Sequence, residues 1–133
     1  MIARIKNEEV RELPVRGIRG ATTVTKNNKE SILASTRELL LALRDANHFE
    51  NQDIVSIFFS MTADLNTAFP AEAARQLGWE KVPLFGMQES YIEGGLGKCI
   101  RILIQINSNK TQDEIRYCYL HEARKLREDL FNH

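Results

Sequence analysis

The chain has few cysteines, no net charge and no long hydrophobic segment, and each absence excludes a class of protein. Two cysteines, Cys99 and Cys118, without a C-x-x-C pair fit neither a zinc site nor a disulfide framework. Eighteen basic residues balance eighteen acidic ones, so the positive field of a general nucleic-acid-binding protein is missing. No run of about 18 apolar residues predicts a membrane span, and the polar first residues are unlike a signal peptide. We expect a cytoplasmic protein with neither a nucleic-acid nor a membrane partner.

The sequence also lacks the motifs of several common catalytic sites. It contains no G-x-S-x-G and no H-E-x-x-H pattern. His48, His121 and His133 are isolated in polar surroundings, where an exposed side chain is much commoner than a metal ligand or a general base. We therefore expect neither a metal nor a cofactor.

A glycine-rich segment at residues 94–98 resembles a phosphate-binding loop only superficially. Cys99 stands where that motif requires Ser or Thr, and no glycine lies five residues before Gly97. The segment also leads into an apolar alternating run, whereas a P-loop leads into a helix. The glycines are better interpreted as a turn or as a point of close backbone approach.

Length and composition predict one domain. A chain of 133 residues with 43% hydrophobic content is near the common domain size. Residues 1–14 are charged and irregular, so we expect an arm that adds little to the core, followed by a single domain at residues 15–133.

One long helix is predicted in the first half of the chain. Asn27 followed by Glu30 is a plausible N-terminal cap, and Asn47 is a suitable C-terminal stop. Six residues between them recur at helical spacing and predict a buried stripe: Ile32, Leu33, Thr36, Leu39, Leu40 and Leu43. A shorter helix is expected at residues 70–77, since proline suits its start and Gly78 its end.

Four segments are predicted to be strands. Residues 15–24 are rich in β-branched residues, and residues 53–60 form a nearly continuous apolar run typical of a strand covered on both faces. Residues 82–85 are a weaker candidate. Residues 99–107 alternate strictly, so their isoleucines face one way while Arg101 faces the other, together with Cys99, Leu103 and Gln105.

The end of the chain is less clear from its pattern. Thr111 followed by Glu114 resembles a capping box and predicts a helical turn, whereas residues 117–120 could be helical or extended.

The elements together predict an α+β fold, a mixed β-sheet with one long helix. Because a helix is about 10 Å wide and strands lie about 4.8 Å apart, one helix leaves part of the sheet uncovered. Homo-oligomerisation would cover it.

The most informative charged residues are arginines in apolar or glycine-rich segments, namely Arg16, Arg19, Arg75 and Arg101. A guanidinium beside a sheet needs an anionic or carbonyl partner, and its planar fork suits a carboxylate. The partner could be an anionic small molecule. For any one arginine alone, an internal Asp or Glu is the commoner partner.

Five segments in the same order resemble the monofunctional chorismate mutases of the trimeric, barrel-like type. They are RGIRGATTV (16–24), TADLNTAFPAEAAR (62–75), VPLFGMQE (82–89), GGLGKCIR (94–101) and DEIRYCYLHEARKLR (113–127). The resemblance implies a cytosolic homotrimer whose mixed sheets form a pseudo-α/β-barrel, with active sites between subunits. It also implies the Claisen rearrangement of chorismate to prephenate, on the route to phenylalanine and tyrosine, without a cofactor.

The resemblance also implies roles for particular residues. Arg19 would bind a substrate carboxylate, and Glu89 would accept a hydrogen bond from the ring hydroxyl. Arg101 would face the ether oxygen and the side-chain carboxylate, to which Tyr119 would donate.

The remaining family positions would come from the adjoining subunit or from the end of the chain. Phe69 and Arg75 would line the cleft from the neighbouring subunit. Leu126 and Arg127 would belong to a mobile C-terminal segment that closes it.

Two departures from the family pattern involve three residues. Phe85 and Gly86 stand where members often carry a small polar residue followed by cysteine, and Glu72 stands where some carry lysine. We expect Glu72 to point to solvent or to pair with Arg75.

Two other functions are compatible with a small trimer of this kind. One is an enamine/imine deaminase, although the segments at 16–23 and 94–101 count against it. The other is a non-catalytic module that binds chorismate or prephenate.

Overall fold

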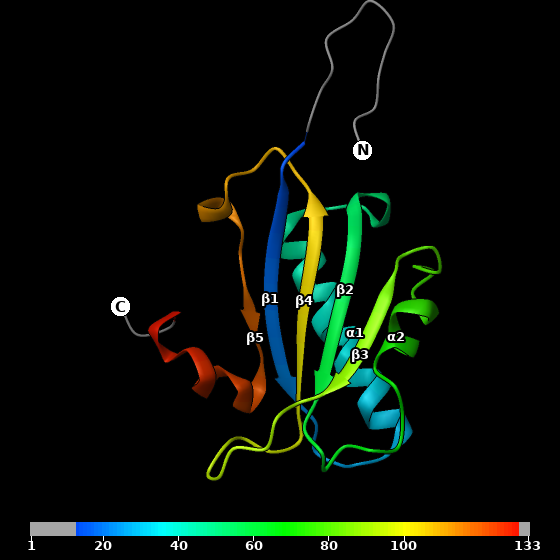
Figure 1. Ribbon diagram of the computed structural model, residues 1–133, viewed down its shortest axis with the longest axis vertical. Helices are drawn as coiled ribbons and strands as arrows, with labels where there is room; N and C mark the ends of the chain where they lie inside the picture. The colour runs from blue at the N-terminus through cyan, green and yellow to red at the C-terminus, as the bar shows by residue number, and fades with distance from the viewer. Residues whose placement is uncertain (1–12, 131–133) are drawn as a thin grey trace, which may run out of the picture.

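A five-stranded mixed sheet forms the centre of the computed structural model, which describes residues 13–130 (Figure 1). The strand order is β3-β2-β4-β1-β5. Central β4 runs antiparallel to β1 and β2, while the outer strands β5 and β3 run parallel to β1 and β2, respectively. The bounds are β1 Val15–Thr23, β2 Ile54–Met61, β3 Leu84–Gln88, β4 Cys99–Asn107 and β5 Cys118–Tyr119. The predicted α+β class is confirmed.

The long helix α1, Lys29–Asn47, packs its predicted apolar stripe against one face of this sheet (Figure 1). All six stripe residues are buried. The helix begins one residue later than predicted, because the Asn28 side chain accepts the Ser31 N–H at 2.8 Å and so caps the first turn. His48, in the left-handed conformation with φ 56°, ends it.

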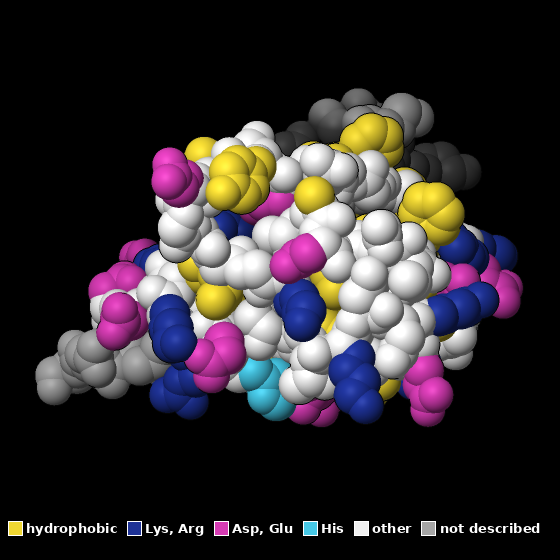
Figure 2. All heavy atoms as spheres, turned by 90° about the horizontal axis from the view of Figure 1, so that it is seen from below, with side chains coloured by type: hydrophobic (Ala, Val, Ile, Leu, Met, Phe, Trp, Pro, Cys, Tyr) yellow, Lys and Arg dark blue, Asp and Glu magenta, His cyan; other side chains and the backbone are white. Residues whose placement is uncertain are grey.

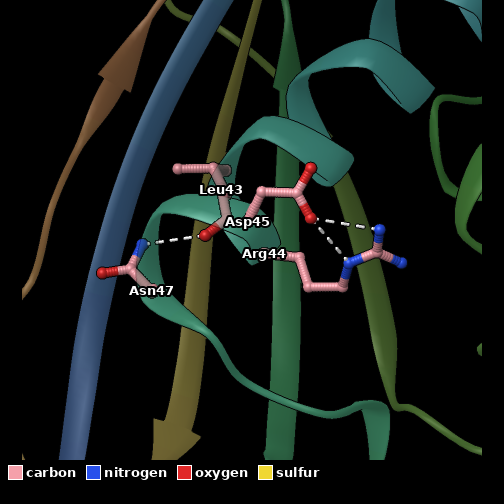
Figure 3. Close-up of polar contacts among 4 residues, drawn as sticks. All are labelled: Leu43, Arg44, Asp45 and Asn47. Atoms are coloured by element: carbon pink, nitrogen blue, oxygen red, sulfur yellow. Dashed lines mark hydrogen bonds and ion pairs between the residues drawn. The ribbon is translucent and has the colours of Figure 1, made fainter.

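Asn47 is therefore the last helical residue and does not itself form the left-handed stop. Its buried side-chain amide donates to the carbonyls of Leu43 and Arg116, both at 2.9 Å, and its oxygen accepts the Arg116 N–H at 2.8 Å. Figure 3 shows the bond to Leu43, with the exposed pair of Arg44 and Asp45 directed away from it. Asn47 thus joins the helix end to the segment that precedes β5.

The second helix packs against α1 and against β3, the strand at one edge of the sheet. Helix α2, Ala71–Gln76, starts after Pro70, and Gly78 beyond its end has a φ of 85°, as a helix stop requires. Strand β3 extends to Gln88, three residues past the predicted strand. Three 3-10 segments complete the described chain: η1 Asn51–Asp53, η2 Gln112–Glu114 and η3 His121–Leu130. The predicted capping box of Thr111 and Glu114 is present in η2.

Both α-helices lie on one face of the sheet, and most of the opposite face stays open (Figure 1). The alternation of β4 has the predicted sense, since its four isoleucines are buried against α1, whereas Arg101 and Leu103 are exposed. The prediction that the strand at 53–60 is covered on both faces is wrong for a single chain. Phe59 is fully buried, but Phe58 is half-buried and Val55 is exposed, because no helix covers the second face.

A small apolar cluster covers one corner of the open face. It consists of Ala21, Cys99, Tyr119 and Ala123, with Leu126 packed against it. This cluster explains why Cys99 is buried although it faces away from the isoleucines. Within residues 13–130 no helix is both long and apolar enough to span a membrane. The predicted arm, residues 1–14, and His133 lie largely or wholly outside the described residues.

Candidate active site

An ion pair on the open sheet face joins two of the predicted site residues. Arg101 projects from the middle strand β4, and Glu89 directly follows β3. Their closest atoms, Arg101 Nε and Glu89 Oε2, are 2.9 Å apart. The Ser60 hydroxyl on β2 donates to the other carboxylate oxygen of Glu89 at 3.2 Å. The Arg101 side chain is 45% exposed, so its guanidinium is oriented by Glu89 and still accessible to a ligand.

Two further predicted residues lie beside this pair because of the strand register. On β1, Arg19 stands opposite Leu103 and Ala21 opposite Arg101. Parallel pairing then places Tyr119 of β5 next to Ala21. Arg19, Arg101 and Tyr119 line one hollow of about 500 Å³ whose floor is mostly apolar. A second hollow of about 480 Å³, lined by Glu89 and Cys99, meets the first at Arg101.

The C-terminal segment brings Leu126 and Arg127 to the same corner. Leu126 packs against the cluster that contains Tyr119. The Arg127 guanidinium carbon lies 6.0 Å from the centre of the Tyr119 ring, within the range of a cation–π contact. Asp129 holds this guanidinium with two hydrogen bonds, of 3.0 and 2.9 Å, and raises the pKa of Arg127 above its usual value.

Phe69 and Arg75 lie apart from these six residues. They line a separate hollow of about 420 Å³ between α2 and the end of β3, and Phe69 is 75% exposed. Met87 borders both this hollow and the one lined by Arg19 and Arg101. Within one chain, the predicted site residues thus form two half-sites: Arg19, Glu89, Arg101, Tyr119, Leu126 and Arg127 in the first, Phe69 and Arg75 in the second.

The first half-site has the chemistry of an anion-binding pocket. Guanidinium groups and a tyrosine hydroxyl offer donors to carboxylates, and Glu89 offers an acceptor to a hydroxyl. Burial raises the pKa of the Cys99 thiol, despite the opposing effect of Arg101, so this cysteine is a protonated, poor nucleophile at neutral pH. Among residues 13–130, no cluster of three or more His, Cys, Asp or Glu side chains could hold a metal ion.

Comparison with known proteins identifies the family. The model of the family described as chorismate mutase type I matches residues 15–130. The chain belongs to the chorismate mutase type I family. Membership assigns chorismate mutase activity, an isomerase activity, to the chain.

Curated and solved chorismate mutases resemble the chain over most of its length. Chorismate mutase AroH of Bacillus subtilis is 45% identical over 117 residues, which are 87% of this chain and 92% of that protein. Chorismate mutase AroH of Thermus thermophilus is 46% identical over 117 residues, which are 87% of this chain and 96% of that protein. The solved structure of a chorismate mutase from Clostridium thermocellum is 43% identical in sequence, with a TM-score of 0.81. The match covers 82% of this chain and 97% of the solved chain.

The structure shows the surroundings of the residues that depart from the family pattern. Glu72 pairs with Lys29 of α1 at 3.4 Å, and its side chain is 33% exposed, so the partner of this acid at the surface is Lys29 and not the expected Arg75. Phe85 makes an edge-on contact with Phe58, with ring centres 6.3 Å apart, and remains 60% exposed on the open face. A Cβ added at Gly86 would meet nothing within 4 Å, so the fold itself does not require glycine there.

Several contacts, inside and outside the candidate site, were not predictable from the sequence motifs. Arg16, one of the four arginines singled out, bonds to the Lys110 carbonyl at 2.6 Å and does not join the half-sites. Ser60, which holds Glu89, gives no signal in an apolar strand. His48 is exposed as expected, while exposed His121 bonds to Glu38 at 2.9 Å.

Proposed function

We propose that the chain converts chorismate to prephenate on its open sheet face, by orienting the substrate and stabilising charge, without a covalent intermediate. The observation that carries this proposal is the Arg101–Glu89 ion pair beside Arg19 and Tyr119. The rearrangement breaks the ether C–O bond and forms a C–C bond within one molecule. It needs no nucleophile or proton transfer from the protein, so shape and charge are what the site must provide.

Arg101 has the central role in this mechanism. As the C–O bond lengthens ahead of C–C bond formation, partial negative charge develops on the ether oxygen. A fixed guanidinium at that oxygen stabilises the transition state more than the ground state. Glu89, itself held by Ser60, keeps the guanidinium in place and would accept a hydrogen bond from the ring hydroxyl.

The other residues of the first half-site would hold the substrate in its compact conformation. Arg19 and Tyr119 would bind carboxylates from β1 and β5, and a snug cleft would select the arrangement in which the reacting carbons meet. Arg127 would add a third cation from the C-terminal segment, and Leu126 would exclude water on that side.

We further propose a cytoplasmic homotrimer in which the second half-site of one subunit completes the first half-site of its neighbour. Two observations support this. Phe69 and Arg75 lie in a separate hollow of the same chain, and the open face exposes apolar side chains such as Phe85 and Leu103. Packing three such faces around one axis would bury them and form the pseudo-barrel. Prephenate would then enter phenylalanine and tyrosine synthesis.

The direct test is the ultraviolet loss of chorismate with purified protein, compared among wild type, Arg101→Ala and Arg101→Lys. We expect prephenate from the wild type and a kcat about 10² to 10³ lower in both variants, because lysine cannot reproduce the planar fork. Circular dichroism checks that the variants fold. Turnover by a folded Arg101→Ala equal to that of the wild type would contradict the role of Arg101.

Two other results would favour the alternative functions. Binding of chorismate without turnover by the wild type would favour a binding module, and ketoacid release from an imine substrate would favour a deaminase.

A further inference from the structure

The last two residues of the glycine-rich segment that resembles a phosphate-binding loop lie against a carboxylate of the same chain. The segment ends the loop of residues 89–98 between β3 and β4, at the lower end of the view in Figure 1. The Lys98 N–H lies 3.0 and 2.9 Å from the two carboxylate oxygens of Asp64, which follows β2. A Cβ at Gly97 would stand 2.8 Å from one of these oxygens. Gly97 therefore permits the close backbone approach that its sequence context predicts.

Asp64 is also joined to the start of β4 through a hydroxyl. The Thr62 hydroxyl donates to the Asp64 carboxylate at 2.6 Å, and the Thr62 hydroxyl oxygen accepts the Cys99 N–H at 2.9 Å. The Thr62 N–H donates in turn to the Cys99 carbonyl at 3.0 Å. The bond from Thr62, supported by the Lys98 N–H, lowers the pKa of Asp64, so its carboxylate is ionised at neutral pH.

The backbone at this junction adopts a conformation that needs support. Lys98 has a φ of 45°, which residues other than glycine seldom adopt. Its N–H is held by Asp64 and its carbonyl accepts the Val24 N–H at 2.8 Å. These contacts determine the direction in which β4 starts. Arg101 lies three residues further along that strand.

The two ends of the loop carry the two members of the ion pair. Glu89 stands at the first end, where its N–H donates to the Met61 carbonyl at 2.7 Å. Arg101 follows the second end, which Asp64 and Thr62 hold. Both ends are thus attached to the end of β2, and the distance between Glu89 and Arg101 depends on both attachments. Figure 2, which views this end of the molecule, shows acidic and basic side chains interspersed.

We propose that Asp64 is a positioning residue for the active site: by binding the Lys98 N–H and the Thr62 hydroxyl, it sets the place of Arg101 relative to Glu89. Asp64 does not touch the reacting atoms and acts through the start of β4. The inference rests on the proposed role of Arg101 in the rearrangement. It also explains Gly97, since a side chain at that position would displace the Asp64 carboxylate.

The test compares Asp64→Ala, Asp64→Asn and the control Glu93→Ala, which removes an exposed acid from the same loop. We expect kcat of the alanine variant to fall about tenfold or more, with a much smaller change in KM, because a small displacement of a catalytic group is costly. Asparagine keeps one oxygen for the Lys98 N–H and should recover part of the loss. Glu93→Ala should resemble the wild type. Unchanged kcat in folded Asp64→Ala would overturn the proposal.

A readout that does not depend on turnover separates this proposal from the proposed function. The NMR resonance of the Arg101 Nε–H, assigned by its absence in Arg101→Ala, should move in Asp64→Ala and stay in place in Glu93→Ala.

A double variant provides a kinetic test of the same coupling. When Arg101→Ala is already present, removal of the Asp64 side chain should lower kcat little further, because the two residues act through one group. An unmoved Arg101 resonance would overturn the positioning role even if chorismate turnover were absent or arose elsewhere. Where turnover is measured, fully additive losses of kcat would overturn it as well.

Discussion

At the scale of single residues, Asn47 and Asp45 show how burial decides the worth of a polar contact. Both stand in the last turns of α1 and both are hydrogen-bonded (Figure 3). Asn47 is 2% exposed and satisfies the N–H and carbonyl of Arg116, whereas Asp45 pairs with Arg44 in solvent. Removing the Asn47 side chain leaves the partly buried N–H and carbonyl of Arg116 without this partner, while removing the Asp45 side chain returns the Arg44 guanidinium to water.

We therefore expect Asn47→Ala to lower the free energy of unfolding by about 2 to 3 kcal/mol. The matched variant Asp45→Ala should change it by less than about 0.5 kcal/mol. Urea denaturation followed by circular dichroism, at one protein concentration, measures both. Equal effects of the two substitutions would show that the Arg116 contacts do not hold the chain before β5.

The predicted site residues and their neighbours also differ in how far the sequence pattern predicted their contacts. The alternation of residues 99–107 placed Arg101 on the face opposite the isoleucines, and the structure confirms it. Nothing in that alternation predicts Glu89 as its partner, because the two residues meet across a loop. The pairing of Glu72 with Lys29 was missed for a related reason: it joins two helices whose relative placement no local pattern specifies.

At the scale of elements, the contact between α1 and β1 depends on the absence of a side chain. A Cβ at Gly20 would lie 2.9 Å from a Leu43 methyl carbon, 3.2 Å from one of Leu39 and 3.1 Å from the Cys118 carbonyl oxygen. Gly20 thus lets the helix and β5 both pack close to β1. Gly17, on the same strand but the open face, has only an ordinary contact at 3.6 Å with Leu103.

Gly20→Ala should accordingly destabilise the fold by about 1 to 3 kcal/mol, since the helix or β5 must shift to admit the methyl group. Gly17→Ala, which adds the same methyl group without a clash, should change stability by less than about 1 kcal/mol. Thermal unfolding at matched concentration distinguishes them. If both variants melted together with the wild type, the packing of α1 on β1 would be more adaptable than these distances imply.

At the scale of the whole molecule, the two half-sites raise the question of how an active site is completed. Phe69 and Arg75 face a hollow of their own, and the first half-site is open to solvent on the uncovered face of the sheet. A second copy that covers this face could bring the two together. The proposed trimer thus links sheet burial to catalysis, and a mixture of inactive variants can test that link.

Mixing Arg101→Ala with Arg75→Ala, followed by subunit exchange, should restore activity. Each variant keeps one half-site intact, so about one quarter of the interfaces in a random trimer would combine two intact halves. Mixing Arg101→Ala with Glu89→Gln should restore nothing, because both substitutions damage the same half-site. Chorismate turnover before and after exchange gives the measurement, and sedimentation gives the assembly size. No gain in the first mixture would contradict a site shared between subunits.

The sequence by itself determined the α+β class, the helix with its buried stripe, the alternation of β4 and, through its collinear motifs, the chorismate mutase family. These features are local in the chain, where periodicity, caps and motif spacing carry the information. Only the tertiary structure decided which face of β2 stays open, that Cys99 is buried in a second cluster, and that Asp64 binds the end of the glycine-rich loop. Each of these depends on groups brought together from distant segments, and such contacts produce no periodic pattern in the sequence from which they could be predicted.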